Sequence, residues 1–512
     1  MNGAESLVHT LLKSGIDTCF ANPGTSEMHF VSALDRIPGM RCVLALAEGV
    51  VTGAADGYAR MTDRPAATLL HCGPGLANGL ANLHNARRAK TPIVNIVGDQ
   101  ATHHRPLDAP LTADTEGWAR PVSAWTRTAT TAQTIGRDAA AAVQAACTAP
   151  GQIATLIAPS DTCWDDGGVV AERLTVPAPA TADEGTLTAI ARVLRGGEPA
   201  VLFLGNAALR EGPLATAGRI AQKTGARMMS PTSNGRIERG AGRTPLERLP
   251  YAGEPARAAL KGVKHLILVG AKAPVGFFAY PGKPPVPYAD DCIIHVLTRE
   301  DQNHADALAR LADALNATEA APVARRGDVE PARGAVTSEA VAQTVSALLP
   351  DHAIVVDESI SFGRAFYPGT VNAAPHDWLQ ITGGAIGNGL PLATGAAIGA
   401  PGRRAVSLQA DGSAMYTLQA LWTQAREQLD VTTVILANRK YAILLGELAG
   451  VGAAAGKTAM DMLDLTRPAL EWVKLANGMG VEAAQADSME KFAELFAMAN
   501  KRKGPFVIEL LI

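Results

Sequence analysis

Two side chains with oxygen donors stand where two apolar runs end. Asp411 follows the run Val406–Gln409, and Asn438 follows the run Val431–Leu436. Residues between them repeat at three- and four-residue steps and predict a helix: Leu418, Leu421, Trp422, Ala425 and Leu429. Such a strand–helix–strand unit belongs to a parallel sheet, and ligands bind beyond the carboxyl ends of its strands. A carboxylate and an amide oxygen there suit Mg²⁺ held with a diphosphate, and Gly412 lets the anion approach the helix N–H groups.

Glu48 is a second acid at a predicted strand end. It follows the run Cys42–Leu46, which has a buried-strand pattern, and it precedes a helix predicted over Val50–Met61. Small residues permit close packing of that helix: Gly53, Ala54, Ala55 and Gly57. Asp-Gly turns are common and acids often cap helices, so Asp411 and Glu48 are each also compatible with an ordinary helix start.

His71 closes a third apolar run, Ala67–His71, directly before a glycine-rich segment. Histidine titrates near neutrality and can transfer protons at such a position, although a strand-end histidine is often merely hydrogen-bonded. The segment Gly73–Gly79 does not predict a dinucleotide site. Its third glycine falls one place late for G-x-G-x-x-G, Pro74 intervenes, and no acidic residue ends a clear second strand.

Three N-terminal segments resemble thiamin diphosphate (ThDP) enzymes that act on 2-oxo acids. The loop NPGTSE, residues 22–27, is similar to one in benzoylformate decarboxylases. The segment EGVVTGAADGYAR, which begins at Glu48, is similar to the segment that carries the family's cofactor-activating glutamate. Gly73-Pro74-Gly75 with Asn78 resembles acetohydroxyacid synthases, also called acetolactate synthases.

The C-terminal part adds the family's GDG…NN motif in altered form. Asp411-Gly412-Ser413 and Asn438 match it, whereas Ala410 replaces the first glycine and Asn438 is flanked by Ala437 and Arg439. The resemblance implies that Asp411, Asn438 and the backbone carbonyl of Lys440 bind Mg²⁺. It places Gly384 and Ile386 against the aminopyrimidine, with Ile386 as the apolar wedge under the bent cofactor. The residues expected around ThDP are Glu48, Asn78, Ser361, Gly384, Ile386, Asp411, Gly412, Ser413, Ala414, Asn438, Tyr441, Ala442 and Ile443.

The chemistry that this resemblance implies is decarboxylation of a 2-oxo acid to an enamine. The enamine is then protonated to release an aldehyde, or it is ligated to a second carbonyl. Glu48 would activate the cofactor, His71 stands where benzoylformate decarboxylase carries a proton-transfer histidine, and Thr25 stands where that enzyme has a serine. That enzyme's second histidine is replaced by the Phe277-Phe278 loop, whose rings need either a hydrophobic core or the mouth of a pocket. The expected substrate pocket is apolar and fairly narrow: Thr25, Ser26, His71, Phe277, Phe278, Ile443 and Leu444.

Two alternatives stay open. The Gly73-Pro74-Gly75 segment and the surrounding residues 71–100 look more like an acetolactate synthase, a carboligase proper. A non-catalytic regulatory subunit with the ThDP fold would be recognised by loss of Glu48, Asp411 or Asn438. All three residues are present.

Length and alternating elements predict three α/β domains, each a parallel sheet flanked by helices. We expect a pyrimidine-binding domain over residues 1–170, a Rossmann-like middle domain over 183–318 and a diphosphate-binding domain over 335–512. Linkers are predicted around Val176–Pro179 and over Glu319–Gly334. Middle domains of relatives bind flavin in some members, and the residues here do not distinguish an FAD site from a scaffold.

Composition narrows the expected partners. The chain is 47% hydrophobic and 19% charged with a net charge of −3, which argues against nucleic acid and anionic membranes as partners. No apolar run approaches the ~18 residues of a membrane span, and six scattered cysteines suit a reducing cytoplasm. The expected partner is a small-molecule 2-oxo acid. The family pairs two chains, the glutamate from one and the diphosphate site from the other, so we expect a homodimeric active unit within a homotetramer.

Overall fold

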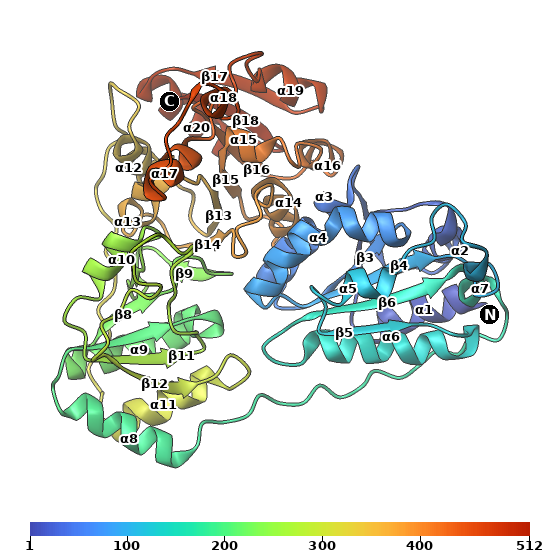
Figure 1. The fold of residues 1–512 in the computed structure, drawn as a ribbon, viewed down its shortest axis with the longest axis horizontal. Coiled ribbons are helices and arrows are strands. Elements are labelled where there is room, and N and C mark those ends of the chain that lie inside the picture. Colours follow the sequence, from blue (N-terminus) through green and yellow to red (C-terminus); the bar gives the residue numbers. More distant parts are fainter.

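The computed structural model describes all 512 residues, which form three helix-flanked sheets (Figure 1). The first sheet is wholly parallel, in the order β2-β1-β3-β4-β6-β5. Its strands are β1 (Thr18–Asn22), β2 (Arg41–Leu44), β3 (Ala66–Leu70), β4 (Ile93–Asp99), β5 (Trp125–Thr128) and β6 (Ile153–Pro159). Its helices are α1 (Gly3–Lys13), η1 (Thr25–Glu27), α2 (Met28–Arg36), α3 (Glu48–Thr62), α4 (Cys72–Ala89), η2 (Arg105–Leu107), α5 (Thr115–Ala119), α6 (Ala132–Cys147) and α7 (Ser160–Trp164).

Central strands β3, β4 and β6 are buried along their whole length, as continuous apolar runs in a parallel sheet should be. The expectation of a buried strand at Cys42–Leu46 is wrong in part. β2 is an edge strand, so Arg41 and Cys42 are exposed and only Val43 is fully buried.

The second sheet, of the middle segment, is also parallel, in the order β10-β8-β7-β11-β12. Its strands are β7 (Ala200–Leu204), β8 (Arg227–Ser230), β10 (Glu247–Arg248), β11 (His265–Val269) and β12 (Ile293–Thr298). Its helices are α8 (Glu184–Arg195), η3 (Asn206–Leu209), α9 (Glu211–Thr224), α10 (Gly253–Ala259) and α11 (His304–Ala314).

The third sheet has the order β17-β18-β16-β15-β13-β14-β9. Its strands are β13 (Ala353–Glu358), β14 (His376–Gln380), β15 (Ala405–Ala410), β16 (Val431–Ala437), β17 (Glu482–Ala486), β18 (Phe506–Leu511) and β9 (Ile237–Arg239). Its helices are α12 (Ser338–Leu348), η4 (Phe362–Ala365), α13 (Phe366–Gly369), α14 (Gly389–Gly399), α15 (Asp411–Ala414), α16 (Ala420–Arg426), α17 (Ala442–Gly450), α18 (Lys457–Asp461), α19 (Trp472–Gly478) and α20 (Met489–Lys501). The six strands of the third domain are parallel, as predicted, and β9, from the middle segment, adds to their sheet by pairing antiparallel with β14.

The prediction of a single helix after Asp411 is also wrong, because two helices follow it. α15 ends at Ala414 and α16 begins at Ala420. Between them Thr417 donates its hydroxyl to the carbonyl of Gly387 at 2.9 Å, which fixes the segment to the loop before α14. α16 ends before Gln428, whose φ of 51° is left-handed, and Leu429 is buried beyond the helix.

Helices α3 and α14 join the first domain to the third, and they cross closely (Figure 1). A Cβ on Gly57 would lie 2.0 Å from the carbonyl oxygen of Leu392. A Cβ on Gly395 would lie 1.7 Å from the carbonyl oxygen of Ala54. Small residues are therefore required at this crossing, as the sequence of α3 predicted, and the two helices share one apolar core.

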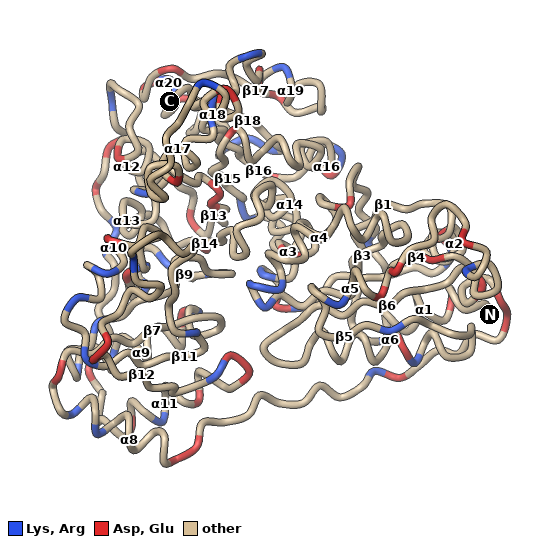
Figure 2. Tube along the Cα trace, viewed as in Figure 1, with Lys and Arg blue, Asp and Glu red and all other residues tan.

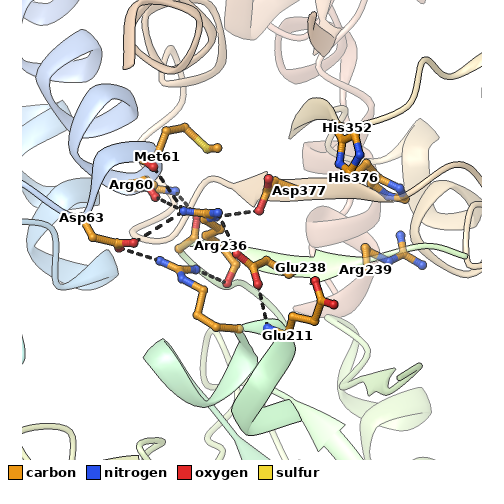
Figure 3. A network of polar contacts seen from close by, with 12 residues as sticks. Arg60, Met61, Asp63, Glu211, Arg236, Glu238, Arg239, His352, His376 and Asp377 are labelled. Carbon is orange, nitrogen blue, oxygen red and sulfur yellow. Dashed lines mark hydrogen bonds and ion pairs between the residues drawn. The ribbon is translucent and has the colours of Figure 1, made fainter. Parts of the chain in front are cut away.

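Arg236 joins all three segments of the chain through polar contacts (Figure 3). Its Nε donates to Asp377 of β14 at 2.6 Å, and its Nη1 donates to the carbonyl of Arg60 in α3 at 3.1 Å. Its Nη2 donates to Glu238 at 2.7 Å. Burial would raise the pKa of Asp377, but the charges of Arg236 and Arg403 outweigh burial and lower it. The junction therefore depends on an ionised, buried aspartate.

Lys and Arg positions are interspersed with Asp and Glu positions along the chain trace of all three domains (Figure 2). None of the helices has the length and apolar character needed to cross a bilayer.

Candidate active site

Asp411 begins α15 at the carboxyl end of β15, as predicted, and it is only 2% exposed. One carboxylate oxygen accepts the N–H of Gly412 at 2.8 Å and the other accepts the N–H of Arg439 at 2.6 Å. Burial raises the pKa of Asp411, although these two N–H groups act in the opposite direction. No cationic side chain forms an ion pair with this carboxylate, so a cation beside it would offset the cost of its burial.

Asn438 lies next to this carboxylate, directly after β16. The contact between Asp411 and the N–H of Arg439 brings the two strand ends together, and the side-chain oxygen of Asn438 accepts the N–H of Lys440 at 3.0 Å. Carboxylate, amide and carbonyl oxygens are the donors that Mg²⁺ takes in proteins. The donor set of Asp411, Asn438 and the Lys440 carbonyl therefore fits this ion.

The same turn has features that suit an anion. A Cβ on Gly412 would lie 2.7 Å from the ring of Tyr441, so the backbone of this turn is closely approached. Nε of Arg439 is buried without a hydrogen-bond partner. Ser413 and Ala414 complete the buried start of α15, whose N–H groups favour negative charge.

A cavity of about 1560 Å³ separates the middle and C-terminal domains beside this turn. Of the predicted residues, it is lined by Gly384, Ile386, Tyr441, Ile443, Leu444, Phe277 and Phe278. The walls of this cavity come from two domains, and the narrow pocket expected from Ile443 and Leu444 stays a prediction. Phe277 and Phe278 are 51% and 56% exposed, so they belong to the cavity wall and not to a core. Ser361 and Ala442 are half-buried near this cavity but do not line it.

Glu358 was not singled out from the sequence, yet it fixes the turn that carries Ile386. It ends β13, is 1% exposed, and accepts the N–H groups of Gly387, at 2.7 Å, and of Gly389. Gln409 also donates to it at 3.1 Å. Burial raises the pKa of Glu358, and these donors act against the rise. Its place after an apolar run was the only available signal.

Glu48 is buried at the first position of α3. Asn78 of α4 donates to its carboxylate at 3.1 Å, and a Cβ on Gly75 would lie 2.9 Å from the same group. The two predicted residues Glu48 and Asn78 are thus in contact. Gly75 leaves the space that the carboxylate occupies.

His71 follows β3, and its partner is Glu27, a residue that the sequence did not identify. Nδ1 of His71 lies 2.9 Å from one carboxylate oxygen of Glu27 and 3.2 Å from the other. Ser26 donates to Glu27 and lies 3.4 Å from the same ring nitrogen. Glu27 is buried, and a Cβ on Gly24 would lie 2.1 Å from the histidine ring. The exposed Thr25 makes no side-chain hydrogen bond.

One chain does not bring all predicted residues together. Every residue that lines the 1560 Å³ cavity lies beyond position 217, so Glu48, Thr25, Ser26, His71 and Asn78 are absent from its walls. The structure thus contains two groups of candidate residues. One is at the carboxyl edge of the first sheet, and the other is at the carboxyl edge of the third.

Known proteins resemble this chain both in its separate domains and over its whole length. The family model "Thiamine pyrophosphate enzyme, N-terminal TPP binding domain" matches residues 1–118, and the corresponding C-terminal TPP binding domain matches residues 367–510. A protein of Mycobacterium tuberculosis that bears the name of an acetolactate synthase large subunit, IlvX, is 52% identical over 100% of this chain and 99% of its own.

Two further relatives are decarboxylases by name. Benzoylformate decarboxylase of Pseudomonas aeruginosa is 29% identical over 98% of this chain and 97% of its own. The solved structure of a thiamine diphosphate-dependent 4-hydroxybenzoylformate decarboxylase of Rhodococcus jostii superposes with a TM-score of 0.86 and 25% identity. It covers 99% of this chain and 98% of that one.

Proposed function

The chain belongs to the thiamine pyrophosphate enzyme family. From this premise we propose that it decarboxylates an apolar 2-oxo acid and releases the aldehyde, and that it can also join the enamine to a second carbonyl compound. The Glu27–His71 pair carries the proposal. A histidine whose Nδ1 is held by a buried carboxylate at 2.9 Å has a fixed ring, and its other nitrogen is free to exchange a proton. Aldehyde release needs a donor that delivers a proton to the enamine carbon; in ligation that carbon bonds to the second carbonyl instead, and the carbonyl oxygen takes up the proton.

The cofactor and its metal would be held by the residues at the third sheet. Asp411, Asn438 and the carbonyl of Lys440 would bind Mg²⁺, and the N–H groups of Gly412 to Ala414 would face the diphosphate. Glu48 would hold the pyrimidine. When bound, ThDP supplies the carbanion that attacks the ketone and accepts the electrons released with CO₂.

The walls of the cavity favour a bulky apolar side chain on the substrate. Phe277, Phe278, Ile443 and Leu444 present apolar surface, and burying such a substituent gains ~25 cal/mol per Å². His71 would be brought to this cavity by a second chain, so the proposal includes a homodimeric active unit, assembled into a homotetramer, with domains over 1–170, 183–318 and 335–512.

An acetolactate synthase-type carboligase is the second candidate. It is favoured by the full-length similarity to the M. tuberculosis protein of that name, at 52% identity. Because synthases of this kind join two small 2-oxo acids, they need no proton donor for aldehyde release. Product identity therefore separates the two candidates.

The test is product analysis with ThDP and Mg²⁺ on benzoylformate and on pyruvate. We expect CO₂ and free aldehyde from benzoylformate, with His71→Ala slowing aldehyde release by ~10²–10⁴-fold. Glu48→Gln serves as the inactive control, and the visible spectrum of the purified protein checks for FAD. Stoichiometric acyloin from pyruvate, with full activity in His71→Ala, would favour the synthase instead.

A further inference from the structure

Two tyrosines from the middle segment converge on one carboxylate of α17. Tyr280 donates its hydroxyl to Oε2 of Glu447 at 2.7 Å, and Tyr251 donates to Oε1 at 3.3 Å. Glu447 forms no ion pair with any lysine or arginine of the chain. Each of its two carboxylate oxygens therefore takes one tyrosine hydroxyl, and these contacts link the middle segment to α17. We call Tyr251, Tyr280 and Glu447 the clasp.

The clasp holds both walls of the cavity. On one wall the rings of Tyr251 and Phe277 lie 5.2 Å apart, and those of Phe277 and Phe278 lie 5.0 Å apart. On the other wall Ile443 and Leu444 stand on the same helix as Glu447. The clasp therefore sets the separation between the aromatic wall and the aliphatic wall.

Phe277 packs on the backbone of Gly384. Its Cζ lies 2.6 Å from where a Cβ on Gly384 would be, so the ring rests directly on the turn expected to line the aminopyrimidine. Phe277 and Phe278 remain 51% and 56% exposed, so their own burial fixes this position only partly. The hydrogen bonds to Glu447 are charge-assisted and hence stronger than neutral ones.

Further contacts support the same loop without crossing to α17. The N–H of Gly276 donates to the carbonyl of Pro285 at 2.7 Å, which closes the loop at its base. Lys283 forms an ion pair with Glu254 at 2.9 Å. These contacts tie the loop to its own segment. The clasp, the packing of Phe277 on Gly384 and the ring of Tyr280 beside Gly450 tie it to the C-terminal domain.

We propose that Glu447 is a positioning residue that determines substrate size: through Tyr251 and Tyr280 it holds Phe277 opposite Ile443 and Leu444, and the fixed gap selects the side chain of the 2-oxo acid. This inference rests on the proposed function. Without the clasp the aromatic wall can move away from α17. The site then adjusts to small and large side chains alike and loses discrimination in KM more than in kcat.

The experiment compares Glu447→Ala and Tyr251→Phe/Tyr280→Phe with the wild-type protein. The matched control is Tyr288→Phe, which removes a hydroxyl from the same segment that makes no side-chain hydrogen bond. Chymotrypsin cleavage after Phe277 or Phe278 reports release of the loop without any need for turnover. We expect cleavage about tenfold faster in both clasp variants and unchanged in the control. Glu447→Gln keeps the side-chain shape and one acceptor oxygen, so its cleavage rate should lie between those of the wild-type protein and Glu447→Ala.

The second readout is the ratio of kcat/KM for benzoylformate to that for pyruvate. It should move toward one by about tenfold in both clasp variants, through KM. Cleavage at the wild-type rate in both variants would overturn the inference, and so would faster cleavage with an unchanged ratio. If the wild-type protein turns over no 2-oxo acid, the proposed function fails, and the protease rates alone decide whether the clasp holds the loop.

Discussion

Glu27 and His71 form a pair whose geometry predicts a measurable dependence of one residue on the other. Glu27→Gln keeps an acceptor oxygen for the ring nitrogen, which lies 2.9 Å from the carboxylate in the wild-type protein, but the amide can also present its N–H group there, so the ring is held less firmly. Aldehyde release should slow by about 10–100-fold, less than on losing His71. Single-turnover rates of aldehyde release measure this. Glu172→Gln, which changes an exposed acid, should match the wild type, and a wild-type rate in Glu27→Gln would contradict the pairing.

Asp411 is the residue on which metal and cofactor retention should depend. Asp411→Ala removes the only carboxylate among the proposed ligands, so ThDP affinity in the presence of Mg²⁺ should fall by about 100-fold or more. Quenching of intrinsic fluorescence on titration with ThDP measures it without turnover. Asp487→Ala removes an exposed acid from the same domain and should bind normally. An unchanged titration in Asp411→Ala would rule out this site.

At the scale of single residues, the sequence identified the acidic residues of the candidate site more completely than the side chains that contact them. The contact between Asp411 and the Asn438 turn followed from strand ends that must meet at one sheet edge. The resemblance placed Glu48 and Asn78 around the cofactor but did not predict the hydrogen bond between them. Glu27 was missed because it stands in a polar loop where nothing indicates burial. Glu447 was missed because its two tyrosine partners lie more than 160 positions away in the chain.

At the scale of elements, the crossing of α3 and α14 depends on glycine. Gly395→Ala would place a methyl group 1.7 Å from the carbonyl oxygen of Ala54, so the helices must separate. We expect the free energy of unfolding to fall by about 1–3 kcal/mol. Gly212→Ala is the matched control, because a Cβ there meets nothing within 4 Å and should stabilise α9 by ~0.5–1 kcal/mol. Denaturant melts measure both, and equal effects of the two substitutions would contradict the packing argument.

Most strands were predictable because apolar runs bounded by turns define buried parallel strands. The break between α15 and α16 was not, because it depends on the hydroxyl of Thr417 finding the carbonyl of Gly387. β9 was not predictable either. Its three residues carry no apolar run, and they pair with β14, a strand of another domain, beside the contact between Arg236 and Asp377.

At the scale of the whole molecule, Asp377 ties the domains together in a pH-dependent way. Its pKa is lowered in the folded chain, so it stabilises the fold fully above the unfolded value of ~3.9. That stabilisation is lost as pH falls through the lower folded-state pKa. Asp377→Asn removes the charge partner of Arg403 and one of the partners of Arg236, which keeps Glu238 at 2.7 Å, and should cost about 1–3 kcal/mol at neutral pH. Thermal melts between pH 3 and pH 7 should show a smaller acid dependence in the variant, and parallel curves would disprove the role.

The division of the candidate site between two sheet edges makes a prediction about two chains. Glu48→Gln inactivates the edge of the first sheet, and Asp411→Ala inactivates the edge of the third. In a mixed dimer one of the two sites combines Glu48 from one chain with Asp411 from the other and is intact. Co-expression with two tags, followed by tandem purification, isolates that dimer. Because closed twofold symmetry makes two equivalent sites, the mixed dimer should have about half the wild-type rate. In a random mixture of the two variant chains about half of the dimers are mixed, so the mixture should have about a quarter of the wild-type rate. Each variant expressed alone should be inactive. If each chain built its own complete site, the mixed dimer would also be inactive, because both chains would carry a defect.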